Sequence, residues 1–216
     1  MKTFKSFIKI TVITLLVVIF AIFVVLIISA LQERPPEHPL DFEDVKDIVL
    51  DKQINSAEDG LPYAIRRAYE WREDSVLTRL VIISRGKKEI ENNTGKVIYI
   101  FEFPCIDKSK PSGNMFISIN TESNSIDYVS SYHDGEGEER SFTELKTDGL
   151  TETIKKVYDI AIKSIGDKNI FKFDKPFVRV HINSDYATFE VSPSQSESNQ
   201  IVYNVKIDMR TYDIVK

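Results

Sequence analysis

The chain has 216 residues, with 28 Lys and Arg, 33 Asp and Glu, three His and one Cys, so its length fits one or two domains. Its first 31 residues contain three lysines and no acid, which leaves residues 32–216 with a net charge of −8. An acidic body lacks the basic stripe needed to bind nucleic acid, so no such partner is expected. One cysteine and three scattered histidines argue against a zinc site and an internal disulfide, and we expect neither metal nor cofactor.

The first predicted element is a membrane span. Ile10 to Leu31 is an uncharged run of 22 residues, 17 of which are Ile, Leu, Val or Phe. As a helix it would be about 33 Å long, enough to cross a hydrocarbon core of about 30 Å. A cleaved signal peptide has a shorter apolar region, and cleavage after Ala30 would put bulky Ile28 where a small residue is required. We therefore predict an uncleaved transmembrane helix over residues 10–31.

The charges beside the span predict its orientation. Three lysines precede it, whereas two glutamates and an arginine follow it. Because basic residues stay on the cytoplasmic side, residues 1–9 form a cytoplasmic tail and residues 32–216 are extracytoplasmic. The expected location is the cell membrane, as a single-pass protein. Residues 32–40 contain three prolines and predict a stiff linker between the membrane and the outer part.

The outer part begins with two predicted helices. Phe42, Val45, Ile48 and Val49 recur at helical spacing, which predicts an amphipathic helix over residues 41–54. A capping box of Ser56 and Asp59 would open the next helix, which ends near Trp71. The apolar face of that second helix is formed by Leu61, Ala64, Ile65 and Ala68.

Strands are predicted next, and then the order repeats. Runs rich in β-branched and aromatic residues, separated by turn residues, cover Val76–Ser84, Val97–Phe103, Met115–Asn120 and Ser125–Ser131. A helix follows over residues 151–165. The last predicted strands are Phe177–Ile182, Tyr186–Val191, Ile201–Asp208 and Tyr212–Val215.

The two halves of the outer part align at their last hairpins. Residues 117–126 match residues 205–214 without a gap, and Ala68 of one helix aligns with Ala161 of the other. We predict an α+β fold of two tandem units, residues 41–146 and 147–216, each with a helix packed on an antiparallel sheet.

This arrangement resembles the PepSY-like, or broadly cystatin-like, extracytoplasmic domains of bacteria. The resemblance rests on the helix end 68–71 (AYEW), the strand Val97–Phe103 and the closing motif 205–214 (VKIDMRTYDI). That family often closes its unit with apolar–x–Ile–Asp–x–x–Thr–Gly–x–Ile. Here Asn124 and Tyr212 replace the glycine. Asn tolerates the left-handed conformation and Tyr does so poorly, which leaves open a different turn type in the second copy.

Several residues could carry chemistry, and each has a simpler interpretation. Cys105 has no supporting motif around a histidine, which favours a free, partly buried thiol over a nucleophile. The acidic run 133–139 (HDGEGEE) could hold Ca²⁺ on its oxygens, but it matches no EF-hand spacing and is more typical of a solvated loop between the units. No metal is expected there.

Three further patterns could also carry chemistry, and each of them has a simpler interpretation. Ser84 to Lys87, like Ser6 to Lys9, matches the S-x-x-K of serine acyl enzymes by letter only, since that serine should open a helix. The triplet 92–94 is a glycosylation sequon that matters only in a eukaryotic secretory host. Five aromatic residues could line a groove, but strand spacing favours the core: Tyr69, Trp71, Tyr99, Phe101 and Phe103.

The sequence therefore supports a non-catalytic binding or regulatory module, with no catalytic residue assigned. The resemblance to PepSY-like domains implies a cell-envelope protein partner, such as a peptidase or a cell-wall synthesis enzyme. One alternative is an anchored envelope hydrolase that uses acids such as Asp134 or Glu138. Another is a structural subunit of an envelope complex.

Overall fold

The computed structural model describes residues 45–86, 89–90, 96–107, 112–133 and 142–215. By its internal contacts Phe42–Lys216 is one compact unit, separate from Met1–Asp41. The described elements, in chain order, are β1 (Val45–Val49), α2 (Ala57–Trp71), β2 (Arg79–Arg85), β3 (Val97–Pro104), β4 (Ser112–Asn120), β5 (Ser125–His133), α4 (Leu150–Ile165), α5 (Asp167–Ile170), β6 (Phe177–Ile182), β7 (Tyr186–Ser192), β8 (Tyr203–Asp208) and β9 (Ile214–Val215). The chain thus has the predicted α+β class.

The helix predicted over residues 41–54 is wrong, because residues 45–49 form strand β1. β1 pairs antiparallel with β5, and its register shifts between Val45 and Ile48. An extra residue at such a bulge separates apolar positions by three instead of two, which imitates helical spacing in the sequence. The valines and isoleucine of this segment also favour a strand.

The helix predicted to end at Trp71 is confirmed as α2, and only half of its capping box forms. Ser56 is the N-cap, and its Oγ accepts from the Asp59 N–H at 3.1 Å. The Asp59 carboxylate accepts from the N–H of Asn55 at 3.2 Å instead of from Ser56. The face of α2 that contacts the sheet is built from small residues. A Cβ on Gly60 would lie only 2.8 Å from Cδ1 of Ile119, so glycine permits this close approach.

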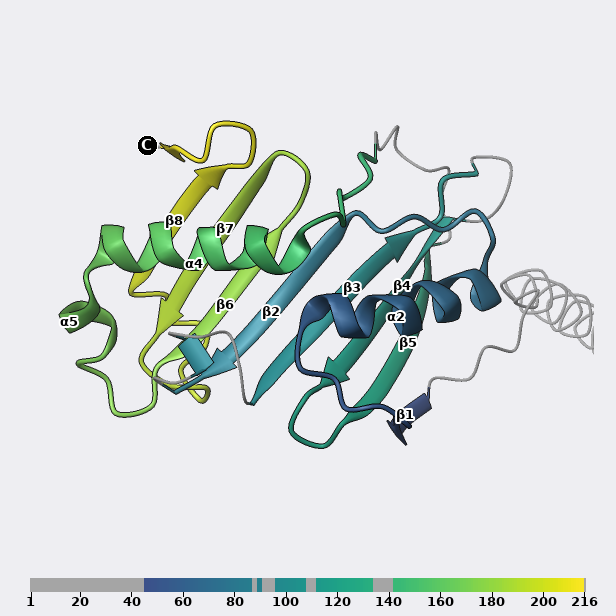
Figure 1. Ribbon diagram of the computed structural model, residues 1–216, viewed down its shortest axis with the longest axis horizontal. Coiled ribbons are helices and arrows are strands. Elements are labelled where there is room, and N and C mark those ends of the chain that lie inside the picture. Colours follow the sequence, from purple (N-terminus) through teal and green to yellow (C-terminus); the bar gives the residue numbers. More distant parts are fainter. Residues whose placement is uncertain (1–44, 87–88, 91–95, 108–111, 134–141, 216) are drawn as a thin grey trace, which may run out of the picture. The chain divides into compact units, whose positions relative to one another are not determined.

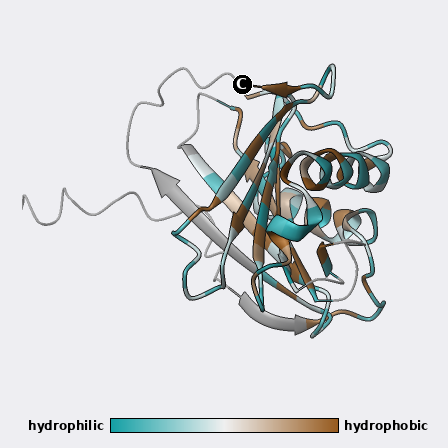
Figure 2. Cartoon of the chain, turned by 90° about the vertical axis from the view of Figure 1, so that its left-hand side faces the viewer, coloured by the Kyte–Doolittle hydropathy of each residue, from teal (hydrophilic) through white to brown (hydrophobic). Residues whose placement is uncertain are grey.

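All nine strands belong to one antiparallel sheet in the order β1-β5-β4-β3-β2-β6-β7-β8-β9 (Figure 1). The two halves meet where β2 pairs with β6, with Val81 opposite His181. We call this pair of strands the seam. α2 contacts β3 and β4, α4 contacts β7 and β8, and the two helices contact each other. Both helices therefore lie on one side of the sheet (Figures 1 and 2).

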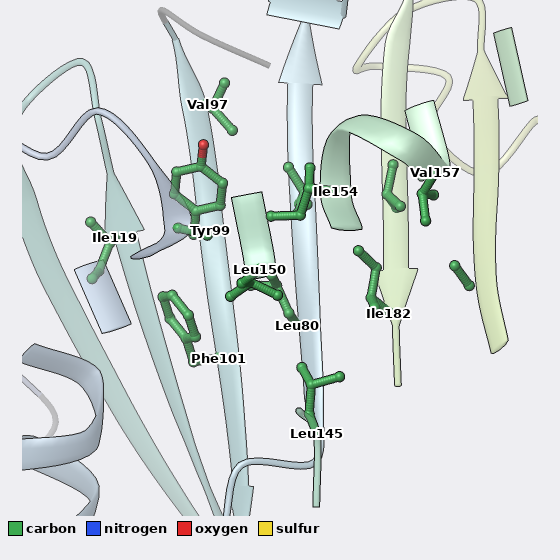
Figure 3. Packing of buried hydrophobic residues seen from close by; sticks show 14 of the residues in the cluster. Leu80, Val97, Tyr99, Phe101, Ile119, Leu145, Leu150, Ile154, Val157 and Ile182 are labelled. Atoms are coloured by element: carbon green, nitrogen blue, oxygen red, sulfur yellow. The ribbon is translucent and has the colours of Figure 1, made fainter. Parts of the chain in front are cut away.

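A hydrophobic core lies between the helices and the sheet and continues across the seam. One row of opposed residues, all buried, runs through six strands: Ile119, Tyr99, Ile82, Val180, Phe189 and Val205. Figure 3 shows Leu150 and Ile154 of α4 beside Leu80 of β2, close to the seam. Because this core is shared, neither half buries its apolar residues alone.

The strand registers of the two halves coincide. Adding 88 to the residue numbers of β3, β4 and β5 reproduces the pairs of β7, β8 and β9. The pair Tyr99–Ile119 becomes Ala187–Ile207, and Ile119–Ile126 becomes Ile207–Ile214. The helix-then-strands order therefore occurs twice with one register, and the seam joins the first strand of each occurrence.

The two closing turns also share their conformation, so the different turn type left open for the second copy does not occur. Asn124 and Tyr212 both have positive φ, 52° and 63°. The side chain of Asp208 accepts from the N–H groups of Arg210 and Thr211, as Asn120 does from the matching residues of the first turn. The strain of a left-handed tyrosine is offset by the Lys156 ammonium, 3.4 Å from its ring centroid, and by packing against the core.

Asn124 provides a test of the first turn. Its Oδ1 accepts from the Ile54 N–H, and its Nδ2 donates to the carbonyl oxygens of Leu50 and Lys52. We expect Asn124→Ala to lower the free energy of unfolding by about 2–3 kcal/mol, through these bonds and the cost of a left-handed alanine. Asn124→Gly should cost about 1 kcal/mol less, because glycine accepts positive φ. Urea denaturation followed by Trp71 fluorescence measures both, and equal losses would contradict a left-handed residue here.

Candidate functional site

The side of the sheet opposite α2 and α4 has no described helix packed on it, and we call it the open face. Strand side chains alternate between the two sides, so buried Leu80 and Ile82 face the helices while Val81 and Ile83 belong to the open face. The centre of this face is the seam, where Val81 and His181 are directly opposed.

An apolar patch occupies the open face on the first-half side of the seam. It consists of Val81, Ile83, Ile98, Ile100 and Phe116, all only partly buried. Val81 lies opposite Ile100, and Ile83 lies opposite Ile98. None of the five belongs to the core cluster or to the residues packed against it. Each of them therefore keeps part of its apolar area exposed.

Charged residues flank this patch in two matching places. Arg79 is opposite Glu102 across β2 and β3, and Arg179 is opposite Glu190 across β6 and β7. These two pairs are equivalent, because each lies next to a matching pair of buried residues. The neighbouring pair is Leu80–Phe101 in the first half and Val180–Phe189 in the second. The open face thus repeats an Arg–Glu cross-strand pair on either side of the seam.

The two pairs differ in their contacts. Arg79 forms an ion pair with Glu102, whose side chain is mostly buried. Glu190 lies instead 3.9 Å from Nε2 of His181. Arg179 has its guanidinium 5.7 Å from the ring centroid of Phe177 and forms no ion pair within the described part of the chain. Within the part of the chain that the structure describes, the open face therefore carries a guanidinium without an ion-pair partner beside an apolar patch.

His181 is a titratable residue at the seam, beside these arginines. Partial burial lowers its pKa below the ordinary value, and the nearby Arg79 and Arg179 guanidinium groups lower it further. Glu190, which lies opposite Arg179 on β7, provides a negative charge 3.9 Å from Nε2 of His181. At neutral pH His181 is therefore uncharged, and the cations of the site are the arginines.

This lowered pKa predicts how stability depends on pH. At pH values between the lowered folded-state pKa of His181 and its unfolded-state pKa of about 6.5, the unfolded chain binds more protons at this histidine than the folded chain does. The contribution of neutral His181 to the free energy of unfolding should therefore be fully present above pH 6.5. It should decrease as the pH falls below that value. We expect the melting temperature of the wild type to drop more between pH 7.5 and 5.5 than that of His181→Gln. Calorimetry measures the difference, and parallel curves would contradict the lowered pKa.

The residues singled out in the sequence do not converge on one site. Trp71, Tyr99, Phe101 and Phe103 are buried, which confirms their interpretation as core, whereas Tyr69 is 54% exposed. Cys105 is a buried thiol that forms no disulfide with a described residue, whereas the sequence favoured a partly buried one. Ser84 is buried in β2 and its hydroxyl is 2.8 Å from that of Tyr158, whose pKa is raised by burial. That serine is therefore held by a neutral phenol, and Lys87 lies outside the described residues.

Other sequence candidates fall outside the described residues or find no support there. The acidic residues 134–139 and the sequon 92–94 are not among the residues described. Within those that are, no three His, Cys, Asp or Glu side chains gather in a way that would hold a metal ion. No described helix has the length and hydrophobicity to cross a bilayer, and the predicted span 10–31 is outside the described part.

Sequence reasoning missed the open face, although a signal for it was present. β2 and β3 read as nearly continuous apolar runs, RLVIISR and VIYIFEFP, with apolar residues on both sides of the strand. A strand covered on one side only would alternate apolar and polar residues. The second half does alternate, with Thr188, Lys206 and Asn204 on its open side.

Comparisons of this chain with protein families, with curated proteins and with solved structures found no match in any of the three.

Proposed function

We propose that this protein is a membrane-anchored, extracytoplasmic binding module that regulates or recruits a cell-envelope protein without performing catalysis. The apolar patch of the open face, which is only partly buried beside the seam, carries the proposal. A surface of this kind on a soluble domain is typical of a protein-binding site. Its position on a wide, regular sheet gives a rigid platform for a partner.

The architecture within this proposal is two PepSY-like or cystatin-like units, residues 41–146 and 147–216, behind the anchor at 10–31. The constant offset of 88 between the paired registers and the two left-handed closing turns support two copies of one unit. The uncharged run of 22 residues and the lysines before it support the anchor and its orientation. A peptidase or a cell-wall synthesis enzyme is the kind of partner that the resemblance implies.

The test is affinity purification of the full-length protein from its native membrane, with a control that keeps only residues 1–40. We expect an envelope protein that is retained by the full-length chain and not by the control. Val81→Thr/Ile100→Thr should release this protein, because it makes the centre of the patch polar without changing side-chain branching.

A matched variant on the helix side separates a specific effect from a general one. Lys163→Gln changes an exposed residue in the last turn of α4 and should leave retention unchanged. Retention of the same proteins by the full-length chain and the control would contradict a binding role for residues 41–216. Turnover of an envelope substrate by the purified protein would contradict the non-catalytic role.

A further inference from the structure

We propose that the open face binds a short, extended acidic segment of its protein partner, with carboxylates on Arg85 and Arg179 and aliphatic side chains on the apolar patch. This inference rests on the proposed binding function and names the chemistry of the partner. The geometry of the seam and the distribution of charged groups around it support this choice of ligand.

The arginines lie along the seam at one end of the patch. Arg85 is opposite Phe177 and Arg179 is opposite Ile83, so the two arginines are diagonal neighbours across β2 and β6. Diagonal Cβ atoms in an antiparallel pair are about 7–8 Å apart, within reach of one another's long side chains. Two guanidinium groups at this separation can each bind a carboxylate of the same segment.

The structure gives neither arginine an ion-pair partner among the described residues. Within the described residues Arg85 and Arg179 form no ion pair, and Arg179 keeps only its contact with the Phe177 ring. Glu102 is paired with Arg79, and Glu190, which lies opposite Arg179, approaches Nε2 of His181 at 3.9 Å. Arg179 is partly buried and Arg85 is exposed. The guanidinium of Arg179 therefore gains more from a carboxylate than one fully in water does, because the local dielectric is lower.

The apolar patch defines the rest of the ligand. Ile83 and Val81 extend along β2 directly from the arginine end, and Ile98 and Ile100 lie beside them on β3. Every second side chain of an extended segment faces the sheet, so a segment whose sheet-facing residues are acidic at one end and aliphatic along the rest would meet both surfaces. The net charge of −8 on residues 32–216 opposes long polyanions, which favours a short segment with apolar residues over nucleic acid.

Two synthetic peptides test the proposal. One carries Glu at two alternate positions at one end and Val or Ile at the alternate positions that follow, and the other carries Lys in place of each Glu. Binding is measured by fluorescence anisotropy on the full-length protein in detergent micelles. We expect the acidic peptide to bind and the basic peptide to bind at least about tenfold more weakly. Equal binding of the two peptides, or no binding of either, would overturn the proposal.

Single-charge variants locate the site. Arg179→Gln should weaken binding of the acidic peptide by about tenfold, since it removes one charged hydrogen-bonding group. Lys163→Gln removes one positive charge from the helix side and should change it by less than about twofold. Val81→Thr/Ile100→Thr should also weaken binding while leaving the Trp71 fluorescence spectrum unchanged. An Arg179→Gln protein that binds the peptide as the wild type does would refute the assignment.

Two more outcomes separate this inference from its alternatives. Sedimentation without peptide shows whether a second copy occupies the open face, and a dimer that Arg179→Gln dissociates would overturn binding of a separate partner. In the affinity purification, an envelope protein retained equally by the wild type and Arg179→Gln would leave the proposed function standing and refute the acidic segment. Peptide binding without any retained envelope protein would contradict the proposed function alone.

Discussion

Replacing Trp71 with alanine is expected to lower the free energy of unfolding by about 3–5 kcal/mol, the cost of removing a fully buried aromatic side chain. Trp71 is the last residue of α2 and has no solvent exposure. The surrounding core is shared by the helices and the sheet, so it cannot collapse fully into the cavity. Urea denaturation followed by circular dichroism of the full-length protein in detergent micelles measures the loss.

Tyr69→Ala is the matched control for this substitution. Tyr69 lies two residues earlier on the same helix and is 54% exposed, so its removal should change stability by less than about 0.5 kcal/mol. Trp71→Phe should fall between the two, because it retains an aromatic ring. A loss for Trp71→Ala no larger than that for Tyr69→Ala would contradict the buried position of the tryptophan.

The second large effect concerns the other half of the sheet. Phe189 in β7 is fully buried, and its ring meets that of Tyr158 edge-to-face with centroids 5.2 Å apart. Phe189→Ala should cost about 3–5 kcal/mol. Because the halves share the seam and one core, this substitution should shift the unfolding transition reported by Trp71 fluorescence in the first half. Trp71 is the single tryptophan of the chain, so the signal is local.

Comparison of two probes decides whether the outer part unfolds as one cooperative unit. In the Phe189→Ala variant, the Trp71 fluorescence and the circular dichroism should give coincident transitions. A fluorescence transition that stays at the wild-type urea concentration while the dichroism shifts would show that the halves unfold independently. Asn204→Ala, an exposed substitution on the neighbouring β8, should leave both transitions in place.

The sequence predicted the elements that have a clear period and failed where a local irregularity changed it. The helices ending at Trp71 and Ile165 and the strands after them have regular apolar spacing, and the structure confirms them. Residues 45–49 were misassigned because a bulge in β1 gives apolar spacing of three. Tyr212 adopts a left-handed backbone conformation that tyrosine disfavours, because Lys156 and the core hold its ring.

The seam and the open face were less accessible to sequence reasoning. The pairing of β2 with β6 depends on which strand edges meet, and no local pattern in residues 79–85 specifies a partner in residues 177–182. The open face depends on this pairing, because only the seam brings Arg85 beside Arg179. The continuous apolar runs of β2 and β3 did indicate strands with apolar residues on both sides, but not what lies opposite them.

The seam also has a consequence for the order in which the protein folds during synthesis. Leu80 pairs with Ile182, which enters the growing chain 102 residues later. At about 5–20 residues per second, the edge of β2 waits about 5–20 s for its partner. During that interval β2 is paired with β3 on one edge only, and its other edge is the type of exposed strand edge that promotes aggregation. Newly made chains are therefore most open to aggregation in the interval before residues 177–182 have emerged.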